Sequence, residues 1–276
     1  MLPVRLTLSS LILVALLLPA GAAYSAQELD LPILEPSTPR VSDINAAVLE
    51  AIRNMPSGGR YAASGVAFEG LGKAVGLTST GLRIDPREAQ PSFCSGATYL
   101  VFVQVLDQLQ RQGAISLDAQ TLRSLLVAHQ HDGQGVWGRW NANGPGTARL
   151  FAELGLGRNF TDFAQARPGD FMKIFWTDEI GQKEHGHSVV YLGTDSVGGQ
   201  EFVRFWSSNM ASGKGDMSGY GYKIVPRTKI ARCIFSRLEN PGNINRIRTA
   251  SGTDVFLASL LSRRVTIEEV RRMCDL

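Results

Sequence analysis

The amino-acid sequence predicts an α+β protein in which several helices precede an antiparallel β-sheet. Segments with apolar residues at helical spacing dominate the chain up to about residue 154. After Pro168 and Gly169 the pattern changes to short runs of β-branched and aromatic residues that are separated by turn residues. Helices followed by a run of strands are the order of an α+β domain and not of alternating βα units.

A long apolar segment, residues 94–109, is the central predicted helix. Its Val and Phe content would suit a strand, but it is longer than a typical strand, and Ser92 precedes it as an N-cap residue. Further helices are predicted over residues 45–55, 117–128 (capped by Ser116) and 147–154, and the glycine-rich residues 59–90 are predicted as loops with one short helix.

Four strand candidates follow, and Gly198 with Gly199 indicates a hairpin turn between the second and the third. The strands are predicted over residues 171–176, 187–192, 201–207 and 229–236. Two closing helices are predicted over residues 253–261 and 266–274.

The first 25 residues have the order of a secretory signal peptide. Arg5 gives a basic start, residues 6–18 are apolar, and the small residues of 20–23 suit a cleavage site. The apolar run is shorter than the roughly 20 residues that a membrane-spanning helix needs. We therefore predict a secreted or periplasmic protein with no membrane span after removal of the signal. The formal net charge of +3 is too small to indicate nucleic-acid binding.

The candidate nucleophile is Cys94, at the start of the central predicted helix. The first turn of a helix lowers the pKa of a thiol because its N–H groups are unpaired. Ser95 and Gly96 are small and leave the thiol open to a substrate, and backbone N–H groups at Cys94 and Ser95 can support an oxyanion. A buried structural cysteine is the alternative interpretation.

The candidate base is His187, which follows Gly186 at the start of a predicted strand and can there reach a helix terminus. His185 is a rival, and a His-x-His pair can also bind metal. The sequence offers no further ligand at a suitable spacing, so we predict no metal site. His129 and His131, beside Asp132, are interpreted as solvated residues at a helix end.

The third group of the site is expected in Ser207-Ser208-Asn209, at the end of the strand that follows the hairpin. Ser207 and Asn209 share one face of that strand because side chains alternate. An amide oxygen on the imidazole gives a Cys-His-Asn arrangement, so Asn209 is the first choice and Ser207 the reserve. A turn-forming Ser-Ser-Asn without a catalytic role is the alternative.

Three short segments together resemble the NlpC-type family of bacterial cell-wall endopeptidases. They are Cys94-Ser95-Gly96, Arg167-Pro168-Gly169-Asp170-Phe171, and His187 followed by Tyr191-Leu192-Gly193. The resemblance implies a papain-like α+β fold, with the cysteine at a helix start packed on the sheet. It also implies cleavage of peptide bonds in peptidoglycan stem peptides by Cys94 and His187, without a cofactor. Asp170 corresponds to a turn before the first strand.

The sequence departs from that family at several positions. Phe93 replaces the Asp that usually precedes the cysteine, and the usual third His is replaced by a choice of Ser207, Ser208 or Asn209. A third residue chosen from these three is similar to the pattern of the cysteine, histidine-dependent amidohydrolases, in which the third catalytic residue can be Asn. The Tyr-x-Trp-Gly-Gly segment of the family is missing, and Tyr61 is a distant candidate to replace it.

These inferences divide the chain into four parts. Residues 1–25 are the signal peptide, 26–90 a linker and N-terminal helical or loop segment, 91–240 the papain-like cysteine hydrolase domain, and 241–276 a C-terminal helical extension. We expect a cysteine peptidase or amidase that acts on peptidoglycan peptides. The alternatives are a non-catalytic wall-binding or scaffolding domain, and a cysteine peptidase or transglutaminase-like enzyme that acts on protein.

The two cysteines outside the candidate site are expected to form a disulfide. An exported protein meets an oxidising compartment, and an odd number of cysteines there indicates one pair and one free thiol. Because Cys94 must stay free to react, Cys233 and Cys274 are the expected pair.

Overall fold

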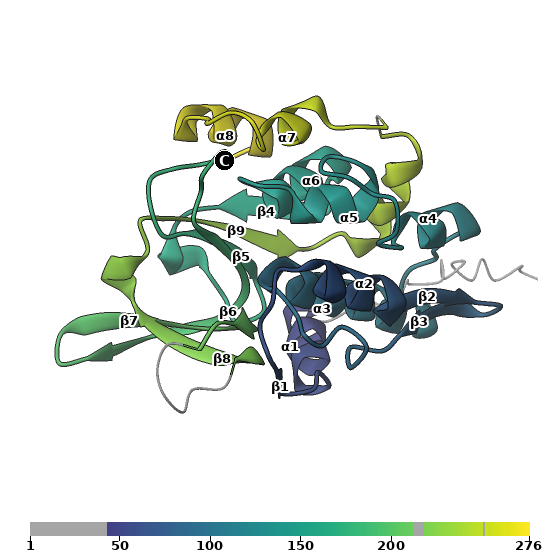
Figure 1. Ribbon diagram of the computed structural model, residues 1–276, viewed down its shortest axis with the longest axis horizontal. Coiled ribbons are helices and arrows are strands. Elements are labelled where there is room, and N and C mark those ends of the chain that lie inside the picture. Colours follow the sequence, from purple (N-terminus) through teal and green to yellow (C-terminus); the bar gives the residue numbers. More distant parts are fainter. Residues whose placement is uncertain (1–42, 212–217, 251) are drawn as a thin grey trace, which may run out of the picture. The chain divides into compact units, whose positions relative to one another are not determined.

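The computed structural model describes residues 43–211, 218–250 and 252–276. This part of the chain forms a mixed α+β structure in which helices pack against an antiparallel sheet (Figure 1). The predicted α+β class is thereby confirmed. The predicted signal peptide (residues 1–25) and most of the linker lie outside the described residues. No described helix combines the length and the hydrophobicity that a membrane crossing requires.

Short helices surround one long helix. The α-helices of the described chain are α1 (Ile44–Arg53), α2 (Gly65–Ala74), α3 (Cys94–Arg111), α4 (Ala119–Ser124), α5 (Gly135–Asn141), α6 (Gly146–Leu154), α7 (Val255–Ser259) and α8 (Ile267–Cys274). Three 3₁₀ segments add η1 (Phe163–Gln165), η2 (Arg227–Lys229) and η3 (Pro241–Arg248).

The main sheet has seven strands in the order β1-β8-β7-β6-β5-β9-β4, and each neighbouring pair is antiparallel. A separate hairpin pairs β2 with β3. The strands are β1 (Gly58–Gly59), β2 (Val75–Thr78), β3 (Gly81–Ile84), β4 (Gly157–Phe160), β5 (Phe171–Phe175), β6 (Gly186–Val197), β7 (Gln200–Asn209), β8 (Gly219–Pro226) and β9 (Arg232–Leu238).

Helix α3 forms the centre of the largest hydrophobic core. Twelve of its 18 residues are buried, and it contacts α1, α5, β6 and β7. Aromatic side chains fill the space beside it: Phe102 stacks on Trp140 with ring centroids 4.8 Å apart, and Phe171 meets Trp140 edge-on at 5.1 Å. A helix that is apolar on nearly all sides is stable only when it is covered on all of them, which is why α3 lies between helices and sheet.

The N-terminal segment belongs to the same core. Val48 and Ile52 of α1 and Leu71 of α2 pack into the cluster that holds α3, and β1 adds an edge strand to the main sheet. The structure thus places residues 43–90 within the core, where the sequence treated them as part of a separate N-terminal segment.

The turn before β5 is fixed by a buried ion pair. Asp170 is fully buried and accepts hydrogen bonds from Arg237 at 2.7 and 2.8 Å and from the Asn45 side chain at 2.9 Å. Its second oxygen also accepts from the backbone N–H of Arg167 at 2.8 Å. Asp170 therefore joins α1, β5 and β9, and its role is structural, as the sequence indicated.

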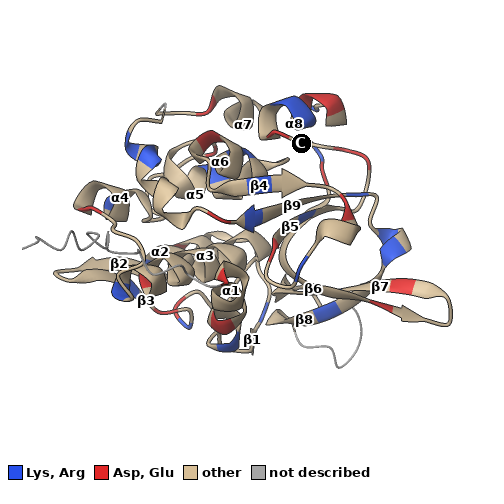
Figure 2. Ribbon diagram, turned by 180° about the vertical axis from the view of Figure 1, so that it is seen from behind, with Lys and Arg blue, Asp and Glu red and all other residues tan. Residues whose placement is uncertain are grey.

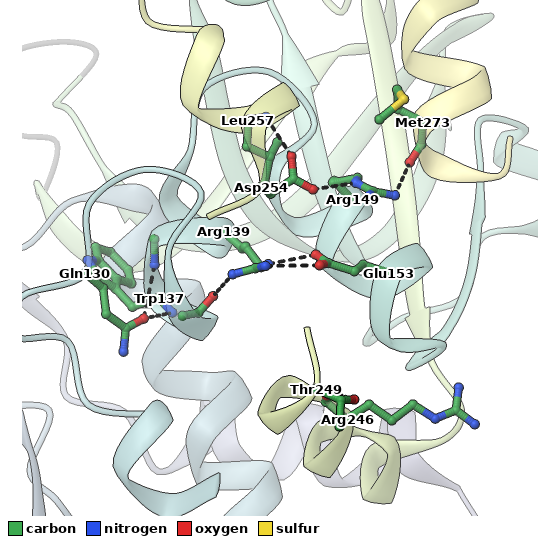
Figure 3. A network of polar contacts seen from close by, with 12 residues as sticks. Gln130, Trp137, Arg139, Arg149, Glu153, Arg246, Thr249, Asp254, Leu257 and Met273 are labelled. Atoms are coloured by element: carbon green, nitrogen blue, oxygen red, sulfur yellow. Dashed lines mark hydrogen bonds and ion pairs between the residues drawn. The ribbon is translucent and has the colours of Figure 1, made fainter. Parts of the chain in front are cut away.

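One arginine of α6 forms polar contacts with both C-terminal helical segments. Arg149 forms an ion pair with Asp254 at 2.8 Å and donates to the carbonyl of Met273 at 3.0 Å (Figure 3). Asp254 also caps α7 through the N–H of Leu257. One side chain of α6 therefore contacts both the start of α7 and the end of α8.

Several predicted boundaries and caps are wrong for local reasons. Helix α4 is shorter than predicted because Asp118, and not Ser116, caps it and accepts from the N–H of Thr121. Ser92 does not cap α3, since its hydroxyl donates to Ser208 at 2.7 Å. Strands β4 and β8, helix α5 and the hairpin of β2 and β3 were not predicted from the sequence.

The predicted disulfide is also wrong: Cys233 and Cys274 are both free thiols. Side chains alternate across a strand, so Cys233 and Ile234 of β9 face opposite sides of the sheet. Cys233 packs with Phe235 inside the curve of the sheet, whereas Cys274 packs with Ile234 on the other side. The sheet itself therefore separates the two thiols.

We predict that Asp170→Ala lowers the free energy of unfolding by about 3–5 kcal/mol, because it leaves the buried Arg237 without its partner. The matched control is Asp195→Ala, which breaks an exposed ion pair with Arg204 and should cost less than about 1 kcal/mol. Urea denaturation followed by tryptophan fluorescence measures both. Equal losses in the two variants would contradict the structural role assigned to Asp170.

Candidate active site

Cys94 is the first residue of α3 and opens into a cavity of about 350 Å³. The preceding residue, Phe93, is extended and buried, and its ring packs on Phe68 at 4.4 Å and against Trp137 at 6.1 Å. This aromatic contact fixes the direction from which the chain enters the helix. Cys94 consequently lies in the first turn, where the N–H groups have no partner within the helix.

His187 lies near the start of β6 and contacts both other members of the site. Its Nε2 is 3.1 Å from Oδ1 of Asn209, and the ring forms a hydrogen bond with the thiol of Cys94. Since Nε2 faces Asn209, Nδ1 is the nitrogen left for the sulfur. Trp176 stacks on the imidazole at 6.2 Å and Phe205 meets it edge-on at 5.7 Å, so its plane is fixed from both sides.

Asn209 is the last residue of β7, and its own amide group fixes its orientation. The Nδ2 atom donates to the carbonyls of Ser207 at 3.1 Å and of Gly221 at 2.9 Å, which leaves Oδ1 directed at His187. Ser207, the reserve choice, has its hydroxyl bonded to the carbonyl of Ser188 at 2.7 Å. The geometry thus pairs His187 with Asn209 and not with Ser207.

A β-bulge in β6 sets this pairing. Near the hairpin Gly193 lies opposite Arg204, but beyond the bulge Val190 lies opposite Trp206, so Leu192 is an extra residue in β6. If the register of Val190 opposite Trp206 continues toward the end of β7, His187 lies opposite Asn209. Without the extra residue every side chain of β7 would meet the other face of β6, and Asn209 would lie beside Ser188.

The environment of Cys94 favours its thiolate. Burial raises the pKa of the thiol, but the hydrogen bond and charge of His187, the backbone of Ser188 and the charge of Lys173 together lower the pKa to about 7. The thiol is therefore about half ionised near neutral pH, which is the state that a nucleophilic cysteine requires.

Tyr61 contributes a second polar group beside the sulfur. Burial, the charge of Cys94 and a hydrogen bond to Cys94 raise the pKa of Tyr61 to about 12, so the phenol is a neutral donor. The backbone beside Tyr61 pairs with the segment before the nucleophile, through hydrogen bonds from Ala62 N–H to Ser92 O at 2.8 Å and from Ser92 N–H to Arg60 O at 3.0 Å. This parallel bridge joins Tyr61 and Ser92, which are 31 residues apart in the sequence. Local sequence patterns do not predict a contact between residues so far apart.

Polar groups on the far wall of the Cys94 cavity form a second cluster. Ser95 Oγ donates to Oδ1 of Asn141 at 2.7 Å, and the Asn141 side chain and Asn143 N–H hydrogen-bond to Asp132. Ser95 was predicted to support the oxyanion, and the structure commits its hydroxyl to Asn141. Asp132 was not predicted as a site residue and was noted only as the neighbour of His129 and His131.

No family model, curated protein or solved structure matches this chain. The function must therefore be inferred from the geometry of the site and from the sequence pattern.

The other three histidines, His129, His131 and His185, belong to no cluster of potential metal ligands among the described residues. Among the described residues, no group of three or more His, Cys, Asp or Glu side chains could hold a metal ion. His129 and His131 are exposed, as the sequence indicated. His185, the predicted rival of His187, precedes β6 and lines a neighbouring cavity, and its carbonyl accepts from the N–H of Trp176 at 2.8 Å.

We predict that alkylation of Cys94 by iodoacetamide accelerates as pH rises through about 7 and levels off above it, because the thiolate is the reactive form. In His187→Ala the effect of burial remains while the hydrogen bond and the charge are lost, so the midpoint moves well above 7 and the rate at pH 7 falls at least about tenfold. Peptide mapping by mass spectrometry separates Cys94 from the two buried thiols. An unchanged midpoint in His187→Ala would contradict the coupling of the two groups.

Proposed function

We propose that this protein is a papain-like cysteine hydrolase that cleaves amide bonds. The observation that carries the proposal is the position of His187, between the thiol of Cys94 and the amide oxygen of Asn209. Nucleophile, base and orienting group are the three components that acyl transfer by a thiol requires. They come from α3, β6 and β7, three elements that pack on one another.

The reaction begins when Sγ of Cys94 attacks the amide carbonyl carbon and His187 accepts the thiol proton. The new S–C bond gives a tetrahedral intermediate. When it collapses, the C–N bond breaks and His187 donates the proton to the leaving nitrogen. Water then attacks the thioester, passes a proton through His187, and the S–C bond breaks. One amide and one water give one carboxylic acid and one amine, and the thiol is restored.

Two donors beside Cys94 suit the developing oxyanion. The backbone N–H of Cys94 lies in the first turn of α3, where no helical carbonyl is available to accept from it. The hydroxyl of Tyr61 bonds to the sulfur in the resting state and is therefore near the carbon that the sulfur attacks. Such preorganised donors stabilise the transition state more than the ground state.

We further propose that the substrate is a peptidoglycan stem peptide and that the protein acts after export through its N-terminal signal. The resemblance of the Cys94, Asp170 and His187 segments to cell-wall endopeptidases supports this choice. A scaffolding domain that only binds the wall has no need of a thiol whose pKa is lowered to about 7, and this favours the enzyme over the scaffold.

We predict that the wild-type protein releases soluble peptides from purified peptidoglycan, and that Cys94→Ala releases none because it lacks the nucleophile. Mass spectrometry of the products, with labelling of new amino groups, identifies the bond that is cut. Casein digested in parallel tests a protein-directed peptidase. Cleavage of casein alone would overturn the peptidoglycan assignment. Cleavage of none of the three substrates, purified peptidoglycan, free stem peptides and casein, would overturn the hydrolase proposal.

We predict that Asn209→Ala lowers the rate of amide hydrolysis by about 100-fold or more, because His187 then loses its orienting acceptor. Ser207→Ala removes a hydroxyl from the same strand and should change the rate less than about threefold, since that hydroxyl bonds only to a backbone carbonyl. Initial rates of both variants, compared with their midpoints of thermal unfolding, separate catalysis from stability. Equal rates in the two variants would mean that Asn209 does not orient His187.

A further inference from the structure

Two cavities flank the cysteine–histidine pair. Cys94 lines the first, of about 350 Å³, and His187 lines the second, of about 410 Å³. Tyr61 and Gly186 line both, so the two cavities adjoin each other beside the cysteine–histidine pair.

The chemistry of the proposed hydrolase assigns a part of the substrate to each cavity. The acyl carbon bonds to the sulfur of Cys94, so the acyl part occupies the first cavity. The leaving nitrogen receives its proton from His187, so the leaving amine occupies the second. This assignment rests on the proposed function.

The acyl-side cavity carries one carboxylate in excess. Lys173 is paired with Glu184 at 2.7 Å, and the other oxygen of Glu184 accepts from the N–H groups of Gly144 at 2.6 Å and Gly181 at 2.8 Å. Asp132 is the second carboxylate on this wall. Burial raises its pKa, which means that its ionised form lacks solvation that a cationic ligand can replace.

The loop that carries Asp132 is held in place by its neighbours. The side-chain oxygen of Gln130 accepts from the N–H of Trp137 at 2.8 Å (Figure 3), and its amide donates to the carbonyl of Ser124 at 2.9 Å. The cluster of Asp132, Asn141 and Ser95 is therefore preorganised at the start of α3.

The leaving-group cavity has the opposite charge. Lys223 of β8 and Lys229 of η2 line it, and the described residues of its wall include no Asp or Glu. Trp176, Phe205 and Val225 supply the apolar surface of the same cavity. Figure 2 shows basic and acidic residues interspersed over the helices and strands.

We propose that the two cavities recognise opposite charges and so fix the direction in which a substrate binds. The acyl part carries a primary ammonium group, which Asp132 accepts, and the leaving amine carries a carboxylate, which Lys223 and Lys229 bind. The preferred substrate is thus a short peptide with a free amino end on the acyl side and a free carboxyl group on the leaving side. Intact cross-linked or glycan-bound stems, in which the amino end is acylated, are poorer substrates.

The test uses one synthetic stem peptide in four forms, with the amino end free or acetylated and the carboxyl groups of the leaving part free or amidated. For the wild type, acetylation and amidation should each lower kcat/KM by about tenfold or more, since each removes a charge-assisted hydrogen bond. In Asp132→Asn the ratio between the free and acetylated forms should fall to near one. In the double variant Lys223→Gln, Lys229→Gln the ratio of kcat/KM between the free and amidated forms should also fall to near one.

The matched controls are Glu69→Gln and Lys73→Gln, which remove exposed charges on α2 outside both cavities and should leave both ratios as in the wild type. Equal kcat/KM for all four peptides in the wild type would overturn the charge assignment while the hydrolase proposal stands. If the wild type cleaves none of them although iodoacetamide still alkylates Cys94, the hydrolase proposal fails and the charge assignment fails with it.

Discussion

The burial of α3 is the constraint on which the rest of the structure depends. The helix is apolar on nearly all sides and contacts both the N-terminal helix α1 and the strands β6 and β7. Rotation about its axis or displacement along it would expose apolar side chains to water or open a cavity in a core that is packed like a solid. The first turn of α3, and Cys94 in it, is therefore fixed by packing alone. The same packing holds the strands that carry His187 and Asn209 against α3.

The register between β6 and β7 decides whether His187 and Asn209 lie next to each other. The hairpin between β6 and β7 starts in a register that would direct Asn209 to the wrong face, and the extra residue Leu192 corrects it. Gly193, beside the bulge, has a φ of 136°, a backbone conformation that glycine adopts without strain. Two side chains of the candidate site are held by neighbouring groups: aromatic rings contact His187, and two backbone carbonyls accept from the amide of Asn209. Such support restricts the orientations that the two side chains can adopt, which is what the proposed proton transfer requires.

The features that sequence analysis predicted are those with a strong local signal. The length and hydrophobicity of residues 94–109 predicted α3, and alternation along the third predicted strand placed Asn209 on one face with Ser207. Strand β8 was missed because glycines interrupt it and much of it is exposed, so it lacks the apolar alternation of a buried strand. Asp132 was missed because its position on the wall of the Cys94 cavity depends on how its loop packs beside α3, which no local pattern reveals. The choice between Asn209 and Ser207 required the register, and the register depends on a bulge that composition does not reveal.

The three cysteines differ in thiol pKa because their burial and their neighbouring polar groups differ. Burial raises the pKa of Cys233 and of Cys274 to about 12, since each thiol packs among apolar side chains with little to stabilise its charge. Burial acts on Cys94 in the same direction, but the imidazole of His187, the backbone of Ser188 and the charge of Lys173 reverse the outcome and bring its pKa to about 7. A thiolate is the species that attacks carbonyls and exchanges with disulfides, so the two inner cysteines stay inert under conditions in which Cys94 reacts. In an oxidising compartment they need no disulfide for protection, because the sheet keeps them apart and burial keeps them protonated.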